Sequence, residues 1–271
     1  MRRRASPAFC IKVSRDTDPF DLPRSRSEAM SAAWALLDAD NTLWHVEPLY
    51  DRARARLVQL LADQGADAHA ADAFQRKRDA QIFETLGYSD KRFEQSFVDT
   101  LHHCAPRSAG PQVERKVRAL ARGALSSPAE VDPDAEQAID LLRRYYKLGM
   151  ITAGDRHIQQ RRIKEFPYIW AFDAIRCVPA KTTDVFDRFC VEHGVDRSRS
   201  VVIGDSLRSD ILPAIKAGLT PIWVRNPNWH AVENQSAAPA GVTAADRLLE
   251  AAQAAVGNRR NDRRGEQAFS A

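Results

Sequence analysis

The chain has few cysteines for its 271 residues, and the four present are scattered: Cys10, Cys104, Cys177 and Cys190. They show no paired spacing typical of a disulfide framework, and together with the seven histidines they form no cluster with zinc-ligand spacing. A single cysteine in a strand, such as Cys177, is more often a buried filler than a nucleophile. The sequence therefore argues against a disulfide-stabilised protein and a zinc enzyme, and we expect reduced thiols in a cytoplasmic protein.

Long apolar runs are also missing, since no segment approaches the ~20 apolar residues that a transmembrane helix needs. Near the amino terminus the apolar stretch is short and interrupted by Lys12, which is not typical of a signal peptide. We therefore expect no membrane segment.

The formal net charge of +4 is concentrated at the two ends of the chain. Residues 1–30 hold seven basic and four acidic residues, residues 256–271 hold four and two, and the remainder carries −1. Terminal arginine clusters of this kind are usually solvated and flexible, so we predict disordered tails over 1–30 and 256–271 and no nucleic-acid-binding face. Because the first expected core strand begins just after Met30, residues 1–29 should be dispensable for folding.

What the sequence does contain is an apolar run, Ala33–Leu37, that ends in two aspartates and a threonine. At the carboxyl end of a buried parallel strand, residues two apart project to the same side, so Asp38 and Asp40 can face one ligand. One carboxylate can attack while the other handles a proton. Together with Thr42 this pattern indicates phosphoryl transfer, with a solvated acidic turn as the alternative.

The second half of the chain supplies partners for these aspartates. A β-branched run at 200–203 leads to Asp205, with Asp210 five residues later, while Thr152 ends another apolar run and Lys181 follows a third. Each residue alone has an ordinary explanation: a turn cap for Thr152, a surface lysine for Lys181, and the first turn of a helix for Asp210. Their order along the chain is what favours a common site.

In this order the motifs, from about Ala33 to about Val224, resemble those of phosphatases of the haloacid dehalogenase superfamily that carry a small helical cap. The resemblance implies the following site: Asp38 as nucleophile, Asp40 as general acid and base, Thr152 and Lys181 as catalytic and phosphate-binding groups, and Ala153 and Gly154 as further phosphate contacts. A carboxylate that attacks a dianionic phosphate needs nearby positive charge, which Lys181 and a divalent cation would supply.

The resemblance also implies a magnesium site with oxygen ligands only, which suits this cation. Its ligands would be the carboxylate of Asp38, the backbone carbonyl of Asp40, and the carboxylates of Asp205 and Asp210. The chain has Ala153 and Thr182 where the family often has Asn and Pro, and neither difference removes a reacting group.

Helical spacing of apolar residues predicts four helices between the first and second motifs. After them, strand and helix patterns alternate, which argues for a parallel sheet with helices on both faces. We therefore predict an α/β fold: a doubly wound, Rossmann-like core over 31–45 and 130–255, with an inserted helical cap over 46–129.

Substrate selection should depend on this cap and on the segment after the first motif, including Trp44, His45 and Glu47. Arg76, Lys77 and Arg78 could reach an anionic substrate, but three consecutive positions wrap around a helix and favour a solvated face. Arg156, Trp229 and His230 are candidates for the rim, where packing is the commoner role.

The function we predict is a magnesium-dependent phosphohydrolase that acts on a small phosphorylated metabolite through an aspartyl-phosphate. A dehalogenase would use the same nucleophile on carbon but would need neither metal nor Asp40, and the pair Asp205 and Asp210 also argues against it. A phospho-accepting signalling module is the third reading, disfavoured because such modules are shorter and lack the insertion.

Overall fold

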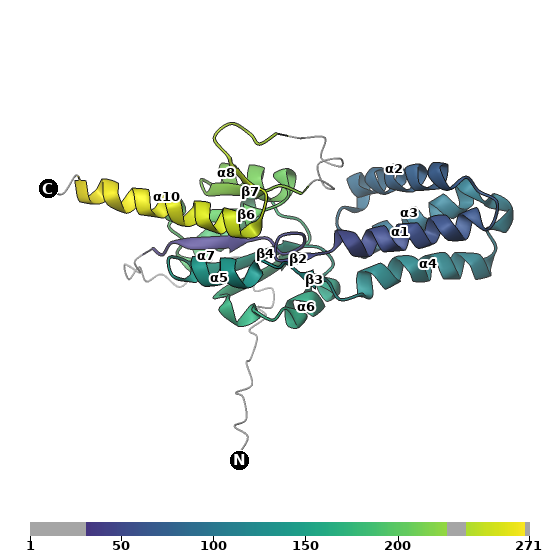
Figure 1. Cartoon of the computed structure of the whole chain (residues 1–271), viewed down its shortest axis with the longest axis horizontal. Helices are drawn as coiled ribbons and strands as arrows, with labels where there is room; N and C mark the ends of the chain where they lie inside the picture. The colour runs from purple at the N-terminus through teal and green to yellow at the C-terminus, as the bar shows by residue number, and fades with distance from the viewer. Residues whose placement is uncertain (1–30, 227–236, 269–271) are drawn as a thin grey trace, which may run out of the picture. The chain divides into compact units, whose positions relative to one another are not determined.

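A six-stranded parallel sheet forms the centre of the computed structural model, which describes residues 31–226 and 237–268 (Figure 1). In spatial order the strands are β5 (Ala174–Val178), β4 (Lys147–Ala153), β1 (Trp34–Leu37), β6 (Val201–Gly204), β7 (Thr220–Val224) and β8 (Thr243–Ala245). From β1 the chain builds one half of the sheet, then returns to the other side of β1 and builds the second half. The strand order thus reverses at β1, where α/β sheets bind ligands at the carboxyl ends of the strands.

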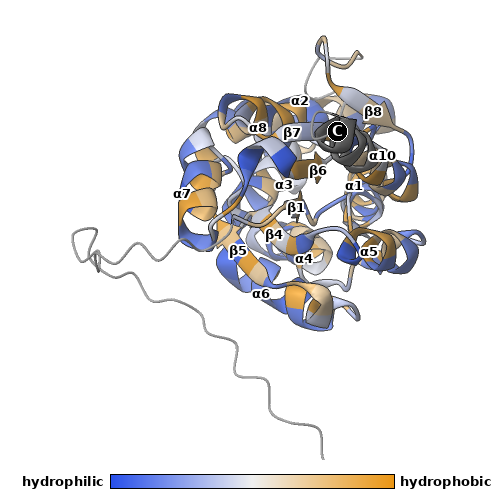
Figure 2. Cartoon of the chain, turned by 90° about the vertical axis from the view of Figure 1, so that its left-hand side faces the viewer, coloured by the Kyte–Doolittle hydropathy of each residue, from blue (hydrophilic) through white to orange (hydrophobic). Residues whose placement is uncertain are grey.

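Helices cover both faces of this sheet, as Figure 2 shows. The helices α5 (Ala135–Arg143) and α10 (Leu248–Ala268) cover one face, while α7 (Thr183–His193) and α8 (Leu212–Lys216) cover the other. Alternation along β1 explains both layers: Ala35 and Leu37 pack toward α5 and α10, whereas Trp34 and Leu36 pack toward α7 and α8. The predicted doubly wound α/β fold is confirmed.

Residues 46–129 form four helices with a hydrophobic core of their own (Figure 1). They are α1 (Glu47–Ala62), α2 (Ala68–Leu86), α3 (Asp90–Cys104) and α4 (Pro111–Ser126), with the single 3₁₀ turn η1 (Pro106–Ser108) between the last two. Asp67 begins α2 by accepting a hydrogen bond from the backbone N–H of Ala70 at 2.7 Å, and Gly87 follows its last residue. We call residues 46–129 the four-helix insertion.

A short antiparallel pair joins the four-helix insertion to the sheet. Its strands are β2 (Trp44–His45), just before α1, and β3 (Glu130–Val131), just after α4. The turn that leads into β2 requires a left-handed backbone at Asn41, whose φ is 62°. The Asn41 side chain accepts hydrogen bonds from the backbone N–H groups of Val46 and Glu47, which fixes the start of α1.

The carboxyl-terminal helix corrects one prediction. We expected disorder from residue 256 onward, but α10 continues to Ala268, and Ala255 and Val256 are buried. The reason is an apolar stripe at helical spacing through Leu248, Ala251 and Ala255, which packs against the sheet and α5 and carries the helix into the arginine-rich segment. The predicted tail over 1–30 lies outside the described residues. Within the described ranges, no helix is both long and apolar enough to span a membrane.

Candidate functional site

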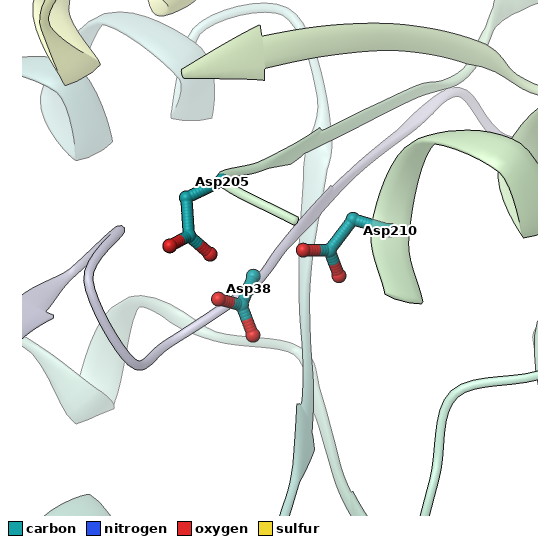
Figure 3. Close-up of side chains that lie close together, drawn as sticks. All are labelled: Asp38, Asp205 and Asp210. Carbon is teal, nitrogen blue, oxygen red and sulfur yellow. The ribbon is translucent and has the colours of Figure 1, made fainter. Parts of the chain in front are cut away.

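Three buried carboxylates meet at the carboxyl edge of the sheet (Figure 3). Asp38 follows β1, Asp205 follows β6, and Asp210 lies in the π-helical turn η4 (Leu207–Ile211). One oxygen of each lies within 4.8 Å of an oxygen of each of the others. These are three of the four residues that the sequence placed around a metal ion.

Lys181 is the cation of this cluster, and it is buried as well. Its Nζ donates hydrogen bonds to Oδ1 of Asp38 and, at 2.5 Å, to Oδ1 of Asp210. The Thr42 hydroxyl donates to the other oxygen of Asp38 at 3.3 Å. Asp38, Lys181 and Asp210, which follow different strands in the sequence, therefore lie in contact in the structure.

The turn after β6 depends on a close approach of backbone and side chain. A Cβ atom on Gly204 would lie 2.5 Å from Cγ of Asp210, so any larger residue would displace this carboxylate. The backbone N–H of Ser206 donates to Oδ2 of Asp210 at 3.1 Å. After Ser206 the chain first forms η4, a type of turn that is frequent at functional sites, and then α8.

Asp205 is held from the neighbouring strand β7. The indole N–H of Trp223 donates to the Asp205 backbone carbonyl at 2.8 Å, and Nδ2 of Asn226 donates to Oδ2 of Asp205 at 3.1 Å. The sequence analysis missed Asn226. Its position just beyond β7, at the same sheet edge as the other motifs, was the available signal.

The electrostatics of this cluster favour an added cation. Burial raises the pKa of Asp38 to about 7, and the nearby Lys181 only partly opposes this effect. Burial also raises the pKa of Asp205, with further contributions from the charges of Asp38 and Asp210. Burial disfavours the charge on Lys181, but Asp210 and Asp38 outweigh it and raise the pKa of the lysine. The charged forms of three acids that share one lysine are therefore unfavourable without further positive charge, which a divalent cation would supply.

Thr152, within β4, has a buried hydroxyl oxygen with no hydrogen-bond partner among the residues that the structure describes. A buried polar atom of this kind calls for a ligand or an ordered water. Ala153 and Gly154 follow it and line an adjacent cleft. The arrangement suits a bound oxyanion.

This cleft lies between the sheet edge and the four-helix insertion. The sheet side contributes Asp40 and Gly154, and the insertion contributes Tyr50, Tyr88 and Arg92. Burial raises the pKa of Tyr88 to about 12, so its hydroxyl stays protonated at neutral pH. The cleft is therefore lined by polar groups from both parts of the chain.

Direct contacts connect the insertion to the sheet side. The hydroxyl groups of Tyr88 and Ser209 are 2.6 Å apart, and Ser209 belongs to the same turn as Asp210. Arg208 forms an ion pair with Glu84 at 3.3 Å. Sequence reasoning did not identify Tyr88, because nothing in α2 or α3 indicates which loop faces the sheet.

Asp40 lies apart from the three clustered carboxylates. Its carboxylate accepts hydrogen bonds from Nε1 of Trp44 at 2.6 Å, Nε2 of Gln159 at 2.8 Å and Nη1 of Arg162 at 3.0 Å. Gln159 and Arg162 belong to α6 (Arg156–Glu165), are both buried, and were missed by the sequence analysis. Their spacing of three residues placed them on one helix face, but charged residues in helices are usually exposed.

The other specificity candidates have local partners. Arg76 and Arg78 pair with Asp72 and Asp99 within the insertion, as expected of a solvated face. The imidazole of His45 lies 3.1 Å from the carboxylate of Asp132. Arg156 is exposed at the start of α6, whereas Trp229 and His230 lie outside the described residues.

Comparison with known proteins connects this geometry to a family. Residues 33–218 match the family model for haloacid dehalogenase-like hydrolases. The pyrimidine 5'-nucleotidase YjjG of Escherichia coli (strain K12) is 33% identical over 98 residues, an alignment that spans 34% of this chain and 44% of that protein. The chain thus covers less than half the length of this relative.

Solved structures of similar fold include a haloacid dehalogenase-like family hydrolase from Xanthomonas campestris. It is 21% identical, with a TM-score of 0.71 and coverage of 86% of this chain and 99% of that one. The L-2-haloacid dehalogenase RSc1362 is 19% identical, with a TM-score of 0.56 and coverage of 83% and 99%. At this level of identity the likeness shows the fold and leaves the reaction to be argued from the site.

Proposed function

The chain belongs to the haloacid dehalogenase-like hydrolases, and we propose that within this family it is a magnesium-dependent phosphohydrolase acting on a small phosphate monoester. The observation that carries the proposal is the cluster of Asp38, Asp205 and Asp210 around Lys181, with Asp40 facing the adjacent cleft. A carbon–halogen hydrolase would need only part of this set.

In the proposed reaction, Asp38 acts as the nucleophile. A carboxylate oxygen of Asp38 forms a bond to phosphorus while the ester oxygen of the substrate leaves, which gives an aspartyl-phosphate. Lys181, already bonded to Asp38, offsets negative charge on the phosphoryl group. The Thr152 hydroxyl would bind a phosphoryl oxygen, with Ala153 and Gly154 beside it at the cleft.

Asp40 supplies the proton chemistry of both steps. It gives a proton to the leaving oxygen in the first step and takes one from the water that attacks the aspartyl-phosphate in the second. The water oxygen then becomes part of the released phosphate, and the Asp38 carboxylate is restored. Asp40 lines the cleft, next to Gly154, where a leaving group would lie.

The residues fit a magnesium ion. The carboxylates of Asp38, Asp205 and Asp210 offer hard oxygen ligands, and the backbone carbonyl of Asp40 is the fourth protein ligand that we propose. When bound, the ion supplies positive charge that reduces repulsion between the attacking carboxylate and the dianionic phosphate.

The second candidate is a dehalogenase, which the fold alone allows, since the structural relatives include dehalogenases such as the L-2-haloacid dehalogenase RSc1362. Halide leaves carbon without a proton, so that reaction has no use for Asp40. It also has no use for the paired acids Asp205 and Asp210. The nucleotidase named among the relatives supports a phosphate ester, and we include pyrimidine nucleotides among the substrates to test.

We propose further that the four-helix insertion acts as a cap that selects the leaving group. Tyr50, Tyr88 and Arg92 line the cleft from this side, facing the residues proposed for chemistry. The partner would be a small phosphorylated metabolite in the cytoplasm.

A metal-supplemented activity screen over phosphorylated metabolites and 2-haloacids tests the proposal. The wild-type protein should release phosphate from at least one ester only when magnesium is present, and Asp38→Asn should release none. Asp140→Asn, at an exposed position of α5, is the matched control and should behave as wild type. Turnover of a 2-haloacid after chelation, with no phosphate ester hydrolysed, would establish the dehalogenase instead.

A further inference from the structure

Arg162 is a buried arginine whose location calls for an explanation. The residue is 3% exposed, and its Nε and Nη2 atoms have no hydrogen-bond partner within the described part of the chain. Burying a charged group with unsatisfied donors is unfavourable, and an apolar side chain of similar volume often stabilises a protein more. A role other than stability therefore accounts best for this residue.

Arg162 interacts with the side chain of Tyr50 and forms an ion pair with the carboxylate of Asp40. Nη1 of Arg162 lies 3.0 Å from Oδ2 and 3.2 Å from Oδ1. Nε2 of Gln159 donates to Oδ2 at 2.8 Å, and Nε1 of Trp44 donates to Oδ1 at 2.6 Å. Donors from α6 and from β2 thus engage both oxygens, so the Asp40 side chain is held in one orientation.

The surrounding backbone is shaped for this contact. Gly154 has φ of 148°, and a Cβ atom there would lie 2.9 Å from Nε2 of Gln159. The same amide nitrogen also donates to the carbonyl of Ala153 at 3.1 Å. Asp155 begins α6 by accepting hydrogen bonds from the N–H groups of His157 and Ile158, which fixes the rotation of the helix toward Asp40.

We propose that Arg162 is a positioning residue that, with Gln159, sets the orientation of the Asp40 carboxylate for proton transfer. This inference rests on the proposed function, in which Asp40 serves the leaving group and the attacking water. A general acid or base must lie within hydrogen-bond reach of the proton that it transfers. Without Arg162, each Asp40 oxygen keeps one donor, from Trp44 or Gln159, and loses the guanidinium that contacts both oxygens, so the carboxylate is held less firmly. Misplacement of a reacting group by ~1 Å can cost ~10²-fold in rate.

The competing explanation is that Arg162 only ties α6 to the segment after β1. If Arg162 has only this structural role, its substitution should lower kcat by the same factor for every leaving group, whether or not Asp40 keeps its carboxylate. If Arg162 positions Asp40, the loss of kcat should depend on both the leaving group and the Asp40 carboxylate. Kinetics on two substrates in two backgrounds therefore separate the explanations.

The variants are Arg162→Met, which keeps length and removes charge, and Arg162→Lys, which keeps the charge. Lys164→Met, at an exposed position on the same helix, is the matched control. Each is made in the wild-type and Asp40→Asn backgrounds. The substrates are phenyl phosphate, whose leaving oxygen needs a proton, and p-nitrophenyl phosphate, whose leaving group departs with little help.

On phenyl phosphate with magnesium, Arg162→Met should lower kcat by ~10- to 10²-fold with little change in KM. The loss should be smaller on p-nitrophenyl phosphate, and Arg162→Lys should recover part of it. In the Asp40→Asn background Arg162→Met should have almost no further effect, and Lys164→Met should match wild type throughout.

Three results would overturn the inference: an equal loss on both substrates, an undiminished loss in the Asp40→Asn background, or wild-type kcat in Arg162→Met. If melting curves show that Arg162→Met does not fold, Arg162→Lys and Gln159→Leu replace it, and the same dependence on substrate and on Asp40 is required. Absence of any Asp38-dependent phosphatase activity in the wild type would instead reject the proposed function.

Discussion

The sheet edge and the four-helix insertion contribute to the site in different ways. At the sheet edge, Asp38 and Asp210 are buried and both accept hydrogen bonds from the buried Lys181, which fixes the three side chains relative to one another. On the insertion, Tyr88 and Arg92 are half-buried and line the cleft, Tyr88 from the loop between α2 and α3 and Arg92 from the first turn of α3. The difference indicates that the sheet edge determines the reaction. Substitutions on the insertion can alter substrate selection without disturbing the reacting residues.

The connections between the sheet and the four-helix insertion agree with these separate roles. The segments β2 and β3 lead into and out of the insertion, and Tyr88 of the insertion forms a hydrogen bond with Ser209 of the sheet side. Such contacts are individually worth about 1 kcal/mol. Substitutions at the sheet edge should therefore abolish turnover, whereas those on the insertion should change substrate affinity.

The largest effect is expected at the nucleophile. Asp38→Asn should fold normally and show essentially no turnover, because the amide oxygen cannot form the aspartyl ester. Steady-state phosphate release and a melting curve check this prediction. A folded variant that keeps near-normal turnover would place the nucleophile elsewhere.

The next effect concerns the metal. Asp205→Ala should weaken magnesium binding strongly, and Asp210→Ala to a comparable or smaller extent, because each removes one oxygen ligand of a hard cation. Magnesium titration followed by calorimetry measures affinity independently of turnover, with Asp140→Asn as control. Full activity after exhaustive chelation would contradict the magnesium assignment.

A smaller and substrate-dependent effect is expected at Asp40. Asp40→Asn should slow alkyl phosphates by ~10² to 10⁴-fold, the range typical of general acid–base catalysis. It should slow p-nitrophenyl phosphate much less, because its phenolate leaves with little need of a proton. Equal losses on both substrates would mean that Asp40 acts only through geometry or the metal.

The smallest effect should arise on the insertion. Tyr88→Phe removes one hydrogen bond to Ser209 and should raise KM by ~5-fold with kcat almost unchanged. Tyr168→Phe is a matched control, because the Tyr168 hydroxyl bonds to Glu136 away from the cleft. A fall in kcat comparable to that of Asp38→Asn would remove the distinction between the two parts.

This contrast also explains how far the sequence was informative. Asp38, Thr152 and Asp205 stand at the ends of strands with clear patterns, and parallel pairing necessarily brings such ends to one edge. The fold and this group of side chains were therefore predictable. Lys181 was identified through its order among the motifs.

The residues that were missed depend on tertiary contacts. Arg162 and Asp40 are 122 residues apart, and the sequence of α6 alone suggests a solvated, basic helix. Asn226 and Tyr88 lie in connecting segments, whose direction no local pattern specifies. The incorrect tail prediction arose because the arginines after Val256 outweighed the alanine stripe that precedes them in α10.

The central claim is that Asp38 is the phosphoryl acceptor beside a magnesium ion. A crystal structure of the wild-type protein with magnesium and beryllium fluoride tests it most directly, because this group mimics a phosphoryl group on a carboxylate. The account predicts beryllium bonded to an Asp38 oxygen, fluorides near Thr152 and Lys181, and magnesium held by Asp205. Beryllium fluoride bonded to another residue, with the Asp38 carboxylate free, would contradict it.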